Sequence, residues 1–289
     1  MKQGFVFPFA DQPPQVVAEL AAAAEAGFDG FFVWEPIWGT DAWVSLAAAA
    51  TRTSTIRLGT MLSPLPRMRP WDLASKAASV DNLSGGRVIL SVGLGAPDTG
   101  YDEFGEVSDR RIRAELLDEG LTIVQGLWGG QPFAHEGKHY QLKPSTFVAP
   151  PPPVQQPRIP IWCPGVWPRP QSMDRALALD GLLPHVMDSE GNHQEVTVDH
   201  IREIREHAFR RRAAMGINAP YEIVIEGRTD PASAADRDRL GDWRSIGVTW
   251  WNEALWEVQS EPDSLDVVRP RVRAGPTAPA ERGRPKPRS

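Results

Sequence analysis

Residues 54–95 read STIRLGTMLSPLPRMRPWDLASKAASVDNLSGGRVILSVGLG, and their pattern decides the fold. Two short apolar runs, at 56–62 and 88–92, are bounded by breaker residues, which is typical of strands buried on both faces. Between them, Pro70 suits the first turn of a helix, and the glycine pair at 85–86 suits its end. A strand, a helix and a second strand joined by short loops predict a parallel, right-handed crossover.

Similar units lie on both sides of this stretch. We expect the remaining strands at 4–9, 30–34, 158–163, 181–183, 221–225 and 248–251, with helices between them. Eight strands, each followed by a helix, predict an α/β fold of the (β/α)8 TIM-barrel type. The proline-rich segment at about 131–158 breaks the alternation, so it is interpreted as an insertion between the fourth and fifth strands.

We divide the chain into one barrel domain at 1–262 and a C-terminal extension at 263–289. The extension is rich in Arg and Pro and has almost no apolar residue after Val272, so most of it is predicted to be flexible. Its first part, at 262–272, is also a candidate cover for the last strand.

The composition limits the kinds of partner. A net charge of −6 argues against nucleic acid, and no apolar run is long enough to span a membrane. The single cysteine, Cys163, excludes an internal disulfide and a cysteine metal cluster, as suits a reducing compartment. With no recognisable signal peptide, we expect a cytoplasmic protein that acts on a small molecule.

Active sites of such barrels lie at the C-terminal ends of the strands, and aromatic side chains crowd these ends. The candidates for a substrate pocket are Phe7, Trp34, Trp38 and Trp250. Indole rings suit a cavity that buries a planar ligand, although core packing is an equally good interpretation of any single one.

Glycines and histidines give weaker signals. Gly93 and Gly95 follow the fourth strand, where they permit close approach of a ligand or simply form a tight turn. Asp98 stands where a dinucleotide-binding fingerprint needs its third glycine, so that interpretation fails. No metal site is expected, because His135 and His139 fit a surface pair in a small hairpin better than a zinc site.

Several motifs together resemble the bacterial luciferase-like superfamily of flavin-dependent oxidoreductases. They are the SGGR corner with its strand ending in GLG, DEGLTIVQGLWGGQPFAHEGKHYQL, RIPIWCPGVWPR and GVTWW, and they span most of residues 3–255. The resemblance implies a barrel that holds FMN or the related deazaflavin coenzyme at its strand ends, without a metal. It also implies a small-molecule substrate and leaves the oligomeric state open, with a homodimer common among relatives.

The resemblance further implies which residues contact the coenzyme. At the end of the third strand, where the family often has a non-proline cis peptide, they are Thr60, Met61, Leu62 and Ser63. After the fourth strand they are Gly93 and Gly95, and after the fifth they are Cys163, Pro164, Gly165 and Val166.

Two departures from the family pattern concern proton transfer. Glu35 and Pro36 follow the second strand where relatives often carry Asp-His, and Ala96 stands where deazaflavin dehydrogenases often place a Glu. Glu35 is our candidate catalytic acid or base, provided that burial raises its pKa; a salt-bridged or capping carboxylate is the alternative.

These observations predict a luciferase-like monooxygenase that uses reduced FMN and O2 on a small organic substrate, with the flavin reduced by a separate reductase. One alternative is a deazaflavin-dependent dehydrogenase or reductase that transfers hydride. A second alternative is a barrel that binds flavin or a metabolite without turnover.

Overall fold

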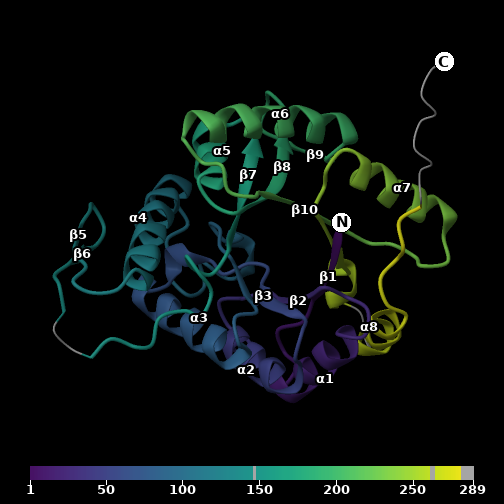
Figure 1. Ribbon diagram of the computed structural model, residues 1–289, viewed down its shortest axis with the longest axis horizontal. Coiled ribbons are helices and arrows are strands. Elements are labelled where there is room, and N and C mark those ends of the chain that lie inside the picture. The colour runs from purple at the N-terminus through teal and green to yellow at the C-terminus, as the bar shows by residue number, and fades with distance from the viewer. Residues whose placement is uncertain (146–147, 261–263, 281–289) are drawn as a thin grey trace.

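The computed structural model describes residues 1–145, 148–260 and 264–280, with the strands in a ring and the helices outside it (Figure 1). The eight parallel strands are β1 (Lys2–Phe7), β2 (Gly30–Val33), β3 (Arg57–Thr60), β4 (Val88–Ser91), β7 (Ile161–Trp167), β8 (Gly181–Met187), β10 (Glu222–Gly227) and β11 (Trp250–Ala254). Each pairs with the next, and β11 pairs with β1, so the sheet closes on itself. The predicted (β/α)8 barrel is confirmed.

The helices that follow the strands begin and end at residues suited to those positions. They are α1 (Pro14–Ala24), α2 (Ala42–Arg52), α3 (Pro70–Ser84), α4 (Arg110–Trp128), α5 (Pro170–Leu177), α6 (Val198–Ala214) and α7 (Ala234–Ser245). Pro70 opens α3, and Gly85, with φ of 69°, ends it in the left-handed conformation that glycine favours. Asp41 and Asp109 accept backbone N–H bonds at the starts of α2 and α4.

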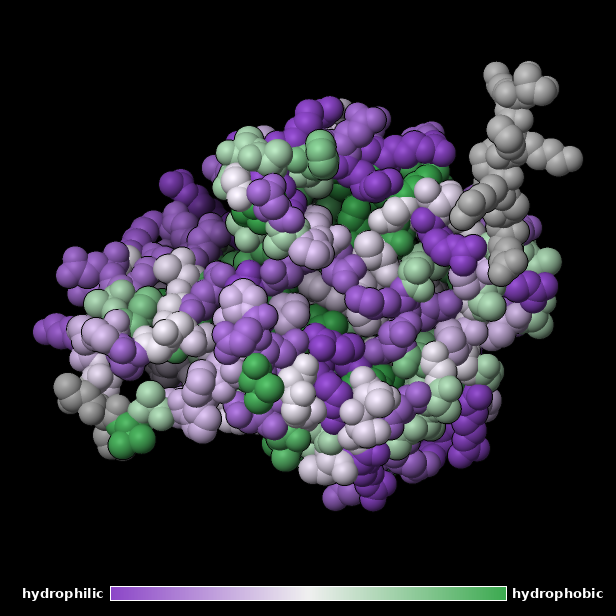
Figure 2. Space-filling view, in the orientation of Figure 1, coloured by the Kyte–Doolittle hydropathy of each residue, from purple (hydrophilic) through white to green (hydrophobic). Residues whose placement is uncertain are grey.

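Alternate residues of each strand face two different cores. One face packs against the helices, as Phe5 and Phe7 do, while Val6 between them belongs to a cluster that fills the barrel interior. This interior cluster also holds Phe32, Met61, Ile89, Trp162, Leu183, Val224, Trp250 and Ala254. Within the described ranges, no helix is long and apolar enough to cross a membrane. Figure 2 shows mostly hydrophilic residues on one face of the molecule, with smaller hydrophobic patches among them.

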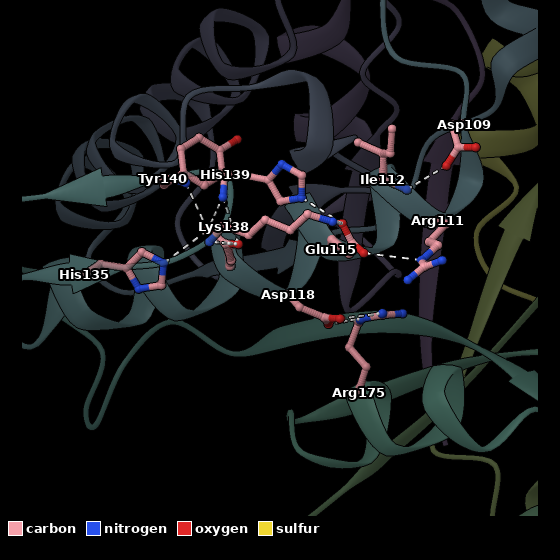
Figure 3. Close-up of polar contacts among 11 residues, drawn as sticks. Asp109, Arg111, Ile112, Glu115, Asp118, His135, Lys138, His139, Tyr140 and Arg175 are labelled. Atoms are coloured by element: carbon pink, nitrogen blue, oxygen red, sulfur yellow. Dashed lines mark hydrogen bonds and ion pairs between the residues drawn. The ribbon is translucent and has the colours of Figure 1, made fainter.

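The insertion after α4 contains the expected hairpin. Its two short strands are β5 (His135–Glu136) and β6 (Gln141–Leu142), which pair in antiparallel fashion. Glu119 of α4 accepts backbone N–H bonds from Lys138, His139 and Tyr140 at 2.8–3.1 Å. Glu115, one turn earlier, bonds to the side chains of Lys138 and His139 (Figure 3). Two carboxylates therefore fasten the hairpin to the barrel.

The C-terminal extension packs against the barrel where the structure describes it. After a 3-10 turn, η3 (Trp256–Ser260), helix α8 (Ser264–Arg273) contacts α1 and buries Val268 and Val272. The chain then runs along the barrel, where the carbonyl of buried Thr277 accepts a bond from the Gln3 side chain. Two valines four residues apart give α8 the apolar face by which it packs, and a largely flexible extension stays a prediction. Residues 281–289 and the predicted boundary at 262–263 lie outside the described residues.

Candidate functional site

A cavity of about 500 Å³ opens at the C-terminal ends of the strands. This volume lies in the range of 300–1,000 Å³ that is usual for pockets that bind small molecules. Nine of the predicted site residues line it: Trp34, Glu35, Met61, Leu62, Gly93, Gly95, Cys163, Pro164 and Val166. The structure thus brings together residues from β2, β3, β4 and β7, as expected of a barrel site.

The floor of this cavity is shaped by closely packed backbone. The peptide bond between Met61 and Leu62 is cis. A Cβ atom added at Gly93 would lie 2.8 Å from Leu62 Cδ2, and one at Gly95, where φ is 80°, would lie 1.9 Å from Tyr101 Oη. Glycine is therefore required at residue 95, whereas a side chain at residue 93 would displace the Leu62 side chain.

Three of the predicted coenzyme contacts lie beside the cavity instead of in its wall. Thr60 is fully buried and donates to the Ser91 carbonyl at 3.1 Å. Ser63 is also fully buried and donates to Glu35. Gly165 faces the helices, because a Cβ there would lie 2.4 Å from Leu182 Cδ1 and 3.0 Å from Met173 Sδ. The alternation of side chains along β7 explains this, since Pro164 and Val166 face the cavity.

Glu35 lies in the cavity wall with two neutral donors. Its Oε2 atom accepts hydrogen bonds from Ser63 Oγ at 2.5 Å and from Trp43 Nε1 at 3.2 Å. Burial raises the pKa of this carboxyl above its ordinary value, against the opposing effects of the Ser63 bond and the charges of Arg67 and Lys76. This is the direction that a role for Glu35 as an acid or base requires, and that role stays a prediction.

Three aromatic residues predicted to line the pocket lie elsewhere. Phe7 is fully buried on the outer side of β1, where its ring packs edge-on against Phe9. Trp38 is 83% exposed in the loop after β2, with its ring 6.4 Å from Phe104. Trp250 is the first residue of β11 and lies at the opposite end of the barrel interior.

The error at Trp250 comes from strand register. The sequence pattern ended the last strand at residue 251, whereas β11 runs from Trp250 to Ala254. The aromatic residue beyond its C-terminal end is Trp256, which does line the cavity. Phe7 fails for the related reason that a one-residue step along a strand reverses the direction of the side chain.

A group of arginines on one side of the cavity was not predicted. Arg110 and Arg113 of α4 line the cavity, and the pKa of Arg110 is lowered by burial and by the charges of Arg169 and Arg113. Arg113 is buried and donates to the carbonyls of Leu94 and Gly95 at 3.1 Å. Its Nε atom has no partner among the described residues. Guanidinium groups gathered in this way suit an anionic ligand such as a phosphate.

Helix α5 completes this side of the cavity. Ser172 and Arg175 line it, and the Arg175 guanidinium is held by both carboxylate oxygens of Asp118 on α4 (Figure 3). The run RRIR at 110–113 was the sequence signal that could have predicted this arginine group. Arginines in the first turn of a helix are repelled by its positive end unless an anion is bound there.

His185, Met187 and His193, from β8 and the short strand β9 (His193–Gln194), also line the cavity. The ring of His185 lies 5.9 Å from that of His193. Burial, and then the charge of His193, lower the pKa of His185, so its neutral form is favoured. Among the residues that the structure describes, no group of three or more His, Cys, Asp or Glu side chains could hold a metal ion.

The sequence is similar to those of several known proteins. A family model described as luciferase-like monooxygenase matches residues 1–252. A putative coenzyme F420-dependent oxidoreductase of Mycobacterium tuberculosis is 39% identical over 133 residues, covering 45% of this chain and 38% of that protein. The oxygenase component of a flavin-dependent trigonelline monooxygenase of Acinetobacter baylyi is 32% identical over 119 residues, covering 41% and 32%. The chain thus matches about a third of the length of these two relatives.

The fold has close structural counterparts. The coenzyme F420-dependent tetrahydromethanopterin reductase of Methanopyrus kandleri superposes with a TM-score of 0.68 at 16% identity, covering 93% of this chain and 97% of that one. At this identity the likeness supports the fold alone.

Proposed function

Because this chain belongs to the luciferase-like monooxygenase family, we propose that it is a monooxygenase that uses reduced FMN and O2 on a small organic substrate. The observation that carries the proposal is one cavity lined both by Arg110 and Arg113 and by the glycine-containing strand end beside the Met61–Leu62 peptide. That arrangement suits a ligand with an anionic end and a flat ring system.

The residues present fit such a coenzyme. Arg110 and Arg113 would hold its phosphate, and the unpartnered Nε atom of buried Arg113 is a donor that this phosphate would satisfy. Met61, Leu62 and Gly93 would lie against its ring. When bound, the coenzyme supplies the redox chemistry, while the protein provides binding, orientation and exclusion of water.

The chain's own contribution to the chemistry centres on Glu35. Burial raises the pKa of this carboxyl, which favours its protonated form, and the Ser63 and Trp43 donors fix the position of its Oε2 atom. Trp34 and Tyr101 line the cavity around it and limit the access of water. The loop residue Trp34 is itself held by a 2.7 Å bond from its Nε1 atom to the Pro8 carbonyl.

A second candidate function is hydride transfer with the deazaflavin coenzyme. It is supported by the 39% identity with the putative coenzyme F420-dependent oxidoreductase. The arginines would serve a phosphate of either coenzyme, so the site itself favours neither. The residue that follows the fourth-strand glycines is Ala96, which supplies no acid or base and therefore weakens this candidate.

Titration with coenzymes tests these candidates. Purified protein is titrated with FMN, reduced FMN and the deazaflavin coenzyme while quenching of tryptophan fluorescence is followed. Micromolar binding of reduced FMN together with substrate-dependent O2 consumption supports the monooxygenase. Binding of deazaflavin alone supports hydride transfer, and binding without turnover across a substrate panel supports a barrel that only binds its ligand.

The source of reduced flavin is part of the proposal. The A. baylyi relative is named as an oxygenase component, which supports a separate reductase as partner here. Adding a flavin reductase with NADH should then sustain O2 consumption that the barrel protein cannot sustain with NADH alone.

A further inference from the structure

The two oxygen atoms of the Glu35 carboxyl have different surroundings. Oε2 accepts both of the hydrogen bonds described above, from Ser63 Oγ and from Trp43 Nε1. Oε1 has no partner among the described residues, yet it is not sealed inside the protein. Because Glu35 lines the cavity at the strand ends, Oε1 is the carboxyl atom that is open to a bound ligand.

This difference decides which oxygen of Glu35 carries a proton. The indole N–H of Trp43 can only donate, so a proton on Oε2 would face it and break that bond. A proton on Oε1 leaves both bonds intact, because Oε2 is an acceptor in the protonated and in the ionised carboxyl alike. Oε1 is therefore the oxygen that gains and loses the proton.

Ser63 is itself fixed by the end of the fourth strand. Its N–H donates to the Ser91 carbonyl at 2.9 Å, and its own carbonyl accepts a bond from the Gly93 N–H at 3.2 Å. The side chain is fully buried, so bulk water does not compete for its hydroxyl. Ser63 thus links the Glu35 carboxyl to the same strand end whose glycines line the cavity.

The charged groups around Glu35 do not hold its carboxyl. Arg67, which follows β3, donates to a backbone carbonyl, and Lys76 of α3 pairs with Asp41 at 3.7 Å. These three charges act on Glu35 only from a distance. In the part of the chain that the structure describes, the two neutral donors on Oε2 are therefore what orients the carboxyl.

We propose that Glu35 exchanges its proton with the bound ligand through Oε1 alone, and that Ser63 is the positioning residue that keeps Oε1 directed into the cavity. The proton passes from Oε1 to an acceptor atom of the ligand, and the carboxylate that is left keeps its two donors on Oε2. The reverse step returns the proton to Oε1. This inference rests on the proposed function, because it assigns how Glu35 acts in the same site.

Infrared difference spectroscopy on acidification tests which oxygen carries the proton. The carbonyl band of protonated Glu35 is identified as the band that Glu35→Gln lacks. Ser63→Ala should shift this band to higher frequency, because a hydrogen bond to Oε2 weakens the carbonyl bond. Ser45→Ala is the matched control and should leave the band in place, since Ser45 is a similarly buried serine whose hydroxyl donates to the Asp41 carbonyl.

Steady-state kinetics test the positioning role. Ser63→Ala should lower kcat about tenfold, because Glu35 remains but is no longer held in place, and should leave coenzyme affinity within a factor of about two. The Ser63 bond opposes the rise in the pKa of Glu35, so its loss should move the limb of the kcat profile that belongs to Glu35 to higher pH. Ser63→Thr keeps the hydroxyl and should restore both kcat and the position of this limb.

An infrared band that stays in place in Ser63→Ala, or that shifts equally in Ser45→Ala, would overturn the inference. Should Ser63→Ala fail to fold, Trp43→Phe removes the other donor to Oε2 and should give the same shift, whose absence would equally overturn it. The infrared measurement needs no coenzyme. A shifted band in a protein that binds neither FMN nor the deazaflavin coenzyme would therefore defeat the proposed function and leave the assignment of the proton to Oε1 standing.

Discussion

Glu35, in the wall of the cavity at the strand ends, and Glu119, beneath the hairpin, are both desolvated. Their pKa values nevertheless shift from the ordinary carboxyl value in opposite directions. Burial raises the pKa of Glu35. Burial alone would also raise that of Glu119, but bonds from the backbone of Lys138, His139 and Tyr140 and from His135 outweigh it, so the pKa is lowered. A carboxylate with many hydrogen-bond donors acts as a fastening, whereas one with few remains available for proton transfer.

The largest expected effect is on kcat, which should fall when Glu35 is replaced but not when Glu119 is. Glu35→Gln removes the group that holds a proton and should lower kcat by about 100-fold or more. Coenzyme affinity, measured by fluorescence quenching, should stay within a factor of about two, because the arginines remain. Glu119→Gln is the matched control and should leave kcat near that of the unaltered protein. An unchanged kcat in Glu35→Gln would remove this residue from the mechanism.

The second expected effect is on the free energy of unfolding, to which Glu119 contributes as an acceptor of backbone hydrogen bonds. Glu119→Ala leaves the N–H groups of Lys138, His139 and Tyr140 without their acceptor, so the free energy of unfolding should fall by about 1–3 kcal/mol. Urea denaturation measures this loss. Glu203→Ala on the exposed face of α6 is the control and should change it by less than about 0.5 kcal/mol. Equal losses in the two variants would mean that the hairpin is not fastened in this way.

A third change tests whether coenzyme affinity depends on a specific arginine, Arg113, instead of on either carboxylate. Arg113→Ala removes a buried guanidinium with an unpartnered Nε atom and should weaken coenzyme binding about tenfold. Arg111→Ala is the neighbouring control, since the Arg111 side chain is 87% exposed, and should have little effect. Similar losses in both variants would point to general electrostatic attraction instead of a specific contact.

The smallest expected effect is the dependence of stability on pH. The raised pKa of Glu35 gives stability that is present below its unfolded value and is lost as pH rises through the folded value. The lowered pKa of Glu119 gives stability that is present above its unfolded value and is lost as pH falls. The difference in unfolding free energy between the unaltered protein and the Gln variant should therefore decrease for Glu35 as pH rises above about 4, and should increase for Glu119 as pH rises toward the ordinary carboxyl value of about 4. The same sign for both would contradict the comparison.

The barrel could be predicted from the sequence because its units repeat and each carries its own boundaries. Pro70 and Gly85 marked one helix without any knowledge of what packs against it. Glu35, Gly93 and Pro164 were found because every strand end points to the same mouth. These predictions needed only the position of a residue along its strand.

The parts of the site that were not predicted from the sequence depend on side-chain direction and on contacts between segments that are distant in the sequence. Trp250 was misplaced because the last strand begins two residues later than its apolar pattern suggested. Arg113 was missed because its position beside Gly95 depends on the packing of α4 across the mouth.

The pairing of β1 with β11 has a consequence for folding during synthesis. Strand β1 emerges from the ribosome before β11, and one edge of β1 pairs with β11. Until some 250 further residues have been synthesised, that edge keeps free N–H and carbonyl groups that neighbouring nascent chains could capture. Folding should accordingly be slow and depend on chaperones, because the first strand must wait for the last.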